Sequence, residues 1–138
     1  MYNKCNNKNA ISICLFCQDQ LNRNPNKLIY DFRDKNSYWY KIYYTSLIQF
    51  IKDYNNSQYY KDFKLILYLE NRLLCFLPEL LTLSEQIEIC HMKLNSIGAS
   101  PGALWRLLAF DNKDLDVVFS SDIDVPFTII SIGYWTNL

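Results

Sequence analysis

Glycine is scarce in this sequence, with only three among 138 residues. A dinucleotide-binding loop of the form GxGxxG and a P-loop of the form GxxxxGK[ST] both need glycines at fixed spacing, because their backbones approach phosphate groups closely. Neither pattern occurs here. The two commonest loop motifs for phosphate binding are therefore excluded.

Net charge is also missing. Fourteen basic and fourteen acidic side chains cancel, so the chain lacks the positive footprint that binds nucleic acid. We expect no nucleic-acid partner. His91 is the single histidine, and nothing around it resembles the nucleophile elbow or triad of a serine or cysteine hydrolase.

Long apolar runs are absent too. The longest, Leu73–Leu83, contains Pro78 and Glu79 and is far shorter than the roughly 20 residues of a membrane-spanning helix. Met1–Ala10 is polar and has no apolar signal-peptide core. An odd set of five cysteines gives no disulfide framework. We expect no membrane span and a reduced, cytoplasmic compartment.

Apolar segments of two kinds fill the chain, and half of all residues are hydrophobic, which suffices for one core. Strand-like runs alternate with helical patterns, which predicts one α/β domain over residues 1–138 with a mostly parallel sheet. The predicted strands are Ile11–Cys17, Phe63–Leu69, Gln86–Met92 and Asp114–Asp124; the predicted helices are Trp39–Tyr54, Arg72–Leu83 with an interruption near Pro78, and Ala103–Phe110 with Leu104, Leu107 and Leu108 on one face.

Three segments lie outside this alternation. Residues 1–10 form a polar N-terminal tail, and the polar segment 18–38 is longer than an ordinary strand-to-helix connection, so we predict a mobile insertion there. For residues 125–138 we predict one extra strand and a tail.

Two carboxylates end the fourth predicted strand, where Val117–Asp124 has the sequence VVFSSDID. Ligands of parallel sheets bind beyond the carboxyl ends of the strands. In an extended segment, side chains two positions apart point to the same side, so Asp122 and Asp124 would form an oxygen-only site suited to Mg²⁺ or Mn²⁺. The alternative is that the two aspartates are turn formers at a strand end.

The block Gly102–Asp124, GALWRLLAFDNKDLDVVFSSDID, resembles a family of GT-A-type glycosyltransferases, mostly uncharacterised, that carry a Trp-Arg-Phe-Leu-like helix followed by a DxD motif. ISICLFC, YKIYYTSLIQFIKDY and DFKLILYLE resemble the first strand, first helix and second strand of that family. The resemblance implies a Rossmann-like domain that binds a nucleoside-diphosphate sugar, with Asp122 and Asp124 holding Mn²⁺ or Mg²⁺ against the diphosphate.

Further site residues follow from this resemblance and from their positions. Arg106 matches the helix arginine of the family and would face either the diphosphate or a carboxylate such as Asp111. Tyr43 would stack on the base or pack in the core, and Glu70, at the end of the second strand, would approach the nucleoside. We expect Trp105 to pack in the core, in preference to a role as a stacking surface for the sugar.

The sequence departs from the family after the DxD motif. Val125 and Pro126 replace a Ser-Arg pair, and nothing beyond them aligns with the acceptor half. The resemblance thus covers a C-terminally truncated, donor-binding half. We expect either part of a metal-dependent glycosyltransferase, completed by a second copy or a partner chain, or a non-catalytic nucleotide-sugar-binding or protein-interaction domain. The acceptor, glycan or protein, is not indicated.

Overall fold

The sheet is the centre of the fold. The computed structural model describes residues 1–16, 32–93, 101–124 and 134–136. Its strands β1 to β5 lie in the order β3-β2-β1-β4-β5, and their bounds are Asn9–Leu15, Phe63–Glu70, Ile87–Met92, Val117–Ser120 and Tyr134–Thr136. β1 to β4 are parallel and β5 pairs antiparallel with β4. The predicted α/β class and mostly parallel sheet are confirmed.

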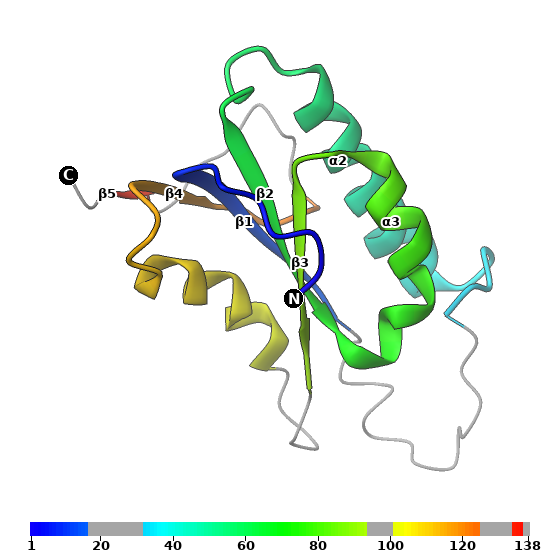
Figure 1. Cartoon of the computed structure of the whole chain (residues 1–138). Coiled ribbons are helices and arrows are strands. Elements are labelled where there is room, and N and C mark those ends of the chain that lie inside the picture. Colours follow the sequence, from blue (N-terminus) through cyan, green and yellow to red (C-terminus); the bar gives the residue numbers. More distant parts are fainter. Residues whose placement is uncertain (17–31, 94–100, 125–133, 137–138) are drawn as a thin grey trace.

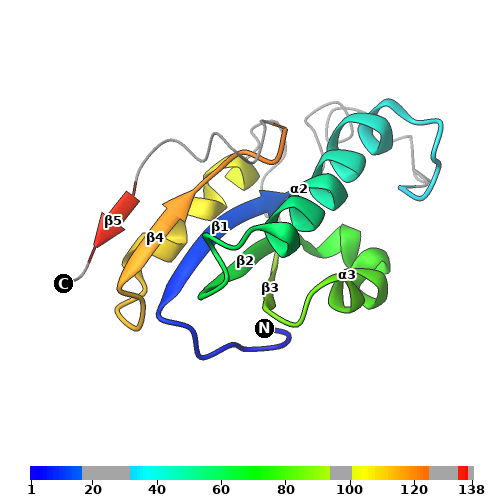
Figure 2. The same cartoon turned by 90° about the horizontal axis from the view of Figure 1, so that it is seen from above.

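Helical segments cover both faces of the sheet (Figures 1 and 2). A π-helical turn, η1 (Tyr40–Tyr44), leads into α2 (Thr45–Asn56), and a 3₁₀ segment, η2 (Asn71–Phe76), leads into α3 (Leu77–Leu83). These elements lie on one face, and the 3₁₀ helix η3 (Pro101–Asp111) lies on the other. Pro78 lies in the first turn of α3, where its missing N–H breaks no hydrogen bond.

The two central strands, β1 and β2, are buried along nearly their whole length. A parallel strand covered on both faces is built mainly of apolar residues, which is why both strands read as near-continuous apolar runs, interrupted by the buried polar residues Ser12 on β1 and Lys64 and Glu70 on β2. On β2, Leu65, Leu67 and Leu69 face α2 and α3, whereas Ile66 and Tyr68 face η3. The sheet therefore separates two cores.

Aromatic rings dominate the core on the side of α2 and α3. Tyr44 and Phe76 stack with their ring centroids 4.2 Å apart, and Trp39 stacks on the same Phe76 ring at 6.0 Å. The Trp39 indole N–H donates to the carbonyl of Phe16 at 3.0 Å. This bond fixes the start of the helix η1–α2 against the end of β1.

The helix η3 packs differently from the sequence pattern. Leu104, Leu107 and Leu108 are exposed, with Leu104 at 64%, whereas Trp105 and Ala109 are buried against the sheet. The Ser12 hydroxyl donates to the Arg106 carbonyl at 2.6 Å, which anchors this part of the helix to β1. The predicted apolar face therefore points to solvent.

The N-terminal segment is tied to the edge of β3. Tyr2 and Ile89 exchange backbone hydrogen bonds of 2.7 and 3.0 Å, and the Asn3 side chain donates to the Ile87 carbonyl at 2.8 Å. Asn3 has φ 55°, a left-handed conformation that asparagine tolerates. The predicted polar tail thus continues the sheet by one isolated bridge.

The remaining segments are described in part. Residues 18–31 of the predicted insertion lie outside the described residues, and Phe32 packs edge-on against Trp39 at 5.6 Å. Of the predicted C-terminal strand and tail, the structure describes β5. Within the described ranges, no helix has the length and apolar character needed to cross a membrane.

Candidate functional site

The order in which strands are added to the sheet changes sides at β1. From β1 the chain adds β2 and then β3 on one side, and it returns to add β4 on the other side of β1. The crossover also changes face, because η3 lies opposite α2 and α3. Such a switch point opens a crevice at the carboxyl ends of the two neighbouring strands, where ligands of open α/β sheets bind.

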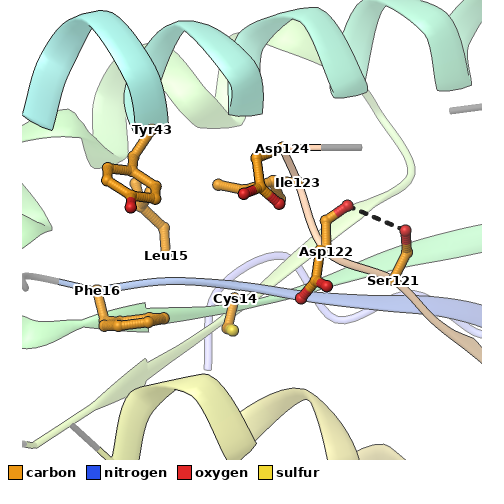
Figure 3. Close-up of a pocket in the computed structure, with 8 residues that line it drawn as sticks. All are labelled: Cys14, Leu15, Phe16, Tyr43, Ser121, Asp122, Ile123 and Asp124. Atoms are coloured by element: carbon orange, nitrogen blue, oxygen red, sulfur yellow. Dashed lines mark hydrogen bonds between the residues drawn. The ribbon is translucent and has the colours of Figure 1, made fainter. Parts of the chain in front are cut away.

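A pocket of about 190 Å³ occupies this crevice. Its lining comes from three parts of the chain, which are the end of β1, the turn η1 and the segment after β4: Cys14, Leu15, Phe16, Tyr43, Ser121, Asp122, Ile123 and Asp124 (Figure 3). The structure therefore brings three predicted site residues, Tyr43, Asp122 and Asp124, to one pocket. We call it the switch-point pocket.

The two aspartates follow the end of β4. The strand ends at Ser120 and a turn begins at Ile123. The prediction that the strand extends through Asp124 is therefore wrong. Asp122 and Asp124 are nevertheless both exposed, because the buried Ile123 between them packs into the core beneath α2. In Figure 3 the Asp122 carboxylate lies close to β1 and the Asp124 carboxylate lies nearer to Tyr43.

Arg106 is the cation beside the pocket. Its Nη2 lies 3.2 Å from Asp122 Oδ1, with the two side chains 20% and 52% exposed. The predicted partner of Arg106 was either the diphosphate or a carboxylate such as Asp111. The structure shows a carboxylate, that of Asp122 in the DxD motif. A half-exposed pair contributes little to stability. It does place a positive charge against Asp122, a lining residue of the pocket.

Cys14 lies at the floor of the switch-point pocket. Burial raises the pKa of its thiol to about 11, despite the opposing effect of Arg106. The thiol is therefore neutral at physiological pH and is a poor nucleophile and a poor metal ligand. The sequence analysis missed Cys14 and Phe16 as lining residues, although their position at the end of a predicted central strand was the available signal.

Other predicted residues lie elsewhere. Glu70 is fully buried, forms an ion pair with Arg72 and is not among the residues that line the switch-point pocket. Trp105 packs in the core beneath η3, as expected. Tyr44, from the same tyrosine cluster as Tyr43, is buried in the core and donates to the Glu79 carboxylate.

The acidic side chains of the pocket are of the chemical kind that a hard divalent cation prefers. Carboxylate oxygens are the preferred ligands of Mg²⁺ and Mn²⁺, and Mg²⁺ usually keeps several waters and binds through one or two carboxylates plus substrate phosphates. In the part of the chain that the structure describes, no three His, Cys, Asp or Glu side chains gather as a metal cage. Asp122 and Asp124 are thus suited to a metal that is shared with a ligand.

Comparisons with protein-family models, curated proteins and solved structures found no match to this chain.

Proposed function

We propose that the switch-point pocket binds a nucleoside-diphosphate sugar together with Mn²⁺ or Mg²⁺, as the donor-binding part of a metal-dependent glycosyltransferase-like protein. One observation carries the proposal. Both DxD carboxylates and Tyr43 line a single pocket between the carboxyl ends of β1 and β4, which is where the strand order changes sides and where nucleotides bind in open α/β sheets.

Asp122 and Asp124 supply the oxygens for the metal. A carboxylate can accept about four hydrogen bonds or ligand contacts, so Asp122 can keep its contact with Arg106 and still bind a cation. Arg106 adds positive charge beside the metal, and its planar fork suits a diphosphate oxygen as well as a carboxylate. Arg106 would contact the diphosphate directly, whereas the two aspartates would hold it through the metal, because carboxylates by themselves repel a diphosphate.

The volume of the pocket sets how much of the donor it takes. About 190 Å³ is below the roughly 300–1,000 Å³ of pockets that enclose a whole small-molecule ligand. The pocket therefore suits the diphosphate and its metal. The base would lie outward, where the aromatic rings of Tyr43 and Phe16 line the wall and provide stacking surfaces.

Transfer needs more than this pocket. When bound, the metal neutralises negative charge that develops on the departing nucleoside diphosphate. Among the described lining residues, Asp122 and Asp124 are the only acids, and both are committed to the metal. For an inverting transfer, a general base would have to come from outside this pocket, which favours binding without turnover as the second candidate function of the chain by itself.

Titration calorimetry with UDP and GDP tests the proposal, in Mn²⁺ and in EDTA. The chain offers a matched control, because Asp114 and Asp116 form a second DxD sequence at the amino end of β4. We expect metal-dependent binding that Asp122→Asn/Asp124→Asn weakens by at least about tenfold, or about 1.4 kcal/mol, while Asp114→Asn/Asp116→Asn leaves it unchanged. A folded wild-type chain that binds neither nucleotide would refute the proposal.

A second measurement separates enzyme from binding module. The chain is incubated with UDP-glucose or GDP-mannose and Mn²⁺, and the release of free nucleoside diphosphate is followed over time. Release that Asp122→Asn/Asp124→Asn abolishes identifies turnover. Binding without release identifies a nucleotide-sugar-binding module.

A further inference from the structure

A second pocket lies at the opposite end of the strands, beside the amino ends of β2 and β3. It has a volume of about 470 Å³ and is lined by the C-terminal ends of α2 and α3 and by the turns that lead into β2 and β3. Among the described residues, none lines both this pocket and the switch-point pocket. We call it the amino-edge pocket, because it lies before the amino ends of these strands.

Hydrogen bonds between different elements hold the walls of the amino-edge pocket. The Tyr54 hydroxyl donates to the Phe63 carbonyl and accepts from Gln86 Nε2 at 2.8 Å. Asn55 Nδ2 donates to the Leu83 carbonyl at 2.7 Å and so joins the ends of the two helices. A ligand would therefore find the walls already in place, which lowers the entropic cost of binding.

The chemistry of the lining narrows the class of ligand. Lys61 and Glu85 contribute one charge of each sign, and the other lining residues are predominantly hydroxyl and amide side chains: Tyr54, Asn55, Ser57, Thr82, Ser84 and Gln86. Hydroxyl and amide groups both donate and accept hydrogen bonds. The Tyr54 hydroxyl and the Gln86 amide already bond within the wall, so Asn55, Ser57, Thr82 and Ser84 supply the groups that match a neutral ligand which donates and accepts at many positions. An anion or a cation would require an excess of one charge.

We propose that the amino-edge pocket binds a neutral mono- or disaccharide. Its volume lies within the range of small-molecule pockets, about 300–1,000 Å³, and Tyr60 adds a ring to the lining on which a sugar face can pack. The site does not rest on the function proposed for the switch-point pocket. A sugar held here lies at the other end of the strands from Asp122 and Asp124, so it would tether a glycan and would not serve as the acceptor of a transfer there.

A titration followed by ¹H–¹⁵N correlation spectra of the full chain tests this site. The probes are the methyl glycosides of glucose, galactose and mannose, together with N-acetylglucosamine and maltose. We expect at least one probe to shift the backbone amides of Ser57, Thr82 and Ser84 saturably, with a dissociation constant of about 1 mM. The amide chemical shifts of Ser121 and Asp122, which line the switch-point pocket, should not change.

A pocket-filling variant provides the control. Thr82→Trp places an indole at the pocket wall, and Lys52→Trp places the same ring on an exposed position of α2 that does not line the pocket. Thr82→Trp should weaken saccharide binding at least tenfold while Lys52→Trp does not, with thermal unfolding confirming that both variants fold.

Three results would overturn the saccharide site: no saturable shift with any of the probes, shifts that persist unchanged in Thr82→Trp, or shifts of the same amides by arginine but not by sugars, which would identify a cation site. The variant Asp122→Asn/Asp124→Asn should retain saccharide binding, so failure of one site and failure of the other are separable.

Discussion

The two faces of the sheet differ in what they bury. The face beneath α2 and α3 buries aliphatic and aromatic side chains, including Leu65, Leu67 and Phe76. The face beneath η3 has a smaller apolar cluster, and the alternation of side chains along a strand places Lys64 and Glu70 on it with Ile66 and Tyr68. One face is therefore a conventional core, whereas the other combines packing with buried charge.

The buried charges are tolerated because they are paired. Lys64 Nζ lies 3.0 Å from Glu88 Oε1 and donates to the Cys5 carbonyl at 2.9 Å, while the Cys5 N–H donates to the same Glu88 oxygen at 3.0 Å. Burying an ion pair repays its desolvation only when further hydrogen bonds satisfy both groups. The N-terminal segment supplies those bonds, so the polar face depends on it.

Neighbouring residues of β2 give the sharpest test of this difference. Leu67 and Ile66 are both buried but face opposite sides. We expect Leu67→Ala to lower the free energy of unfolding by about 4 kcal/mol and Ile66→Ala by about 2 kcal/mol, because a cavity in the larger core collapses less. Urea denaturation of both variants measures this; equal losses would contradict the asymmetry.

The ion pair is the next test. Lys64→Met leaves the Glu88 carboxylate buried without its cation, and we expect a loss of about 3 kcal/mol in the free energy of unfolding. The double variant Lys64→Met/Glu88→Leu removes both charges and should recover a large part of that loss. If the double variant is less stable than Lys64→Met, the pair itself stabilises the fold more strongly than we infer.

The outer side of η3 should contribute least. Leu104, Leu107 and Leu108 are exposed, and surface substitutions usually change stability by no more than about 0.5 kcal/mol each. The triple change of these leucines to glutamine should therefore leave the unfolding midpoint nearly unchanged. A loss comparable to that of Leu67→Ala would mean that the three leucines are buried in solution.

Much of the fold could be predicted because strands and helices have distinct apolar patterns. The central strands β1 and β2 read as near-continuous apolar runs, and the stripe over Trp39–Tyr54 predicted the helix that the structure shows as η1 and α2. The orientation of η3 could not be predicted, because its sequence is apolar nearly all round. The side of η3 that carries Trp105 packs against the sheet, and Ser12, which is far away in the sequence, donates a hydrogen bond to the helix at Arg106.

The candidate site was predicted in part for similar reasons. Asp122 and Asp124 follow a recognisable strand, and their common exposure follows from the apolar Ile123 between them. That Arg106 meets Asp122, and that Phe16 and Cys14 complete the switch-point pocket, depends on which strands become neighbours. Strand order is a tertiary property that no local pattern specifies.

The bridge between Tyr2 and Ile89 also bears on how the protein behaves when concentrated. The outer edge of β3 would otherwise present unpaired backbone groups, to which a strand of another molecule can add. Two backbone hydrogen bonds from Tyr2 and the Asn3 side chain occupy this edge. Detachment of these few residues, for instance by proteolytic clipping, would expose this edge of β3 to strand addition by another molecule.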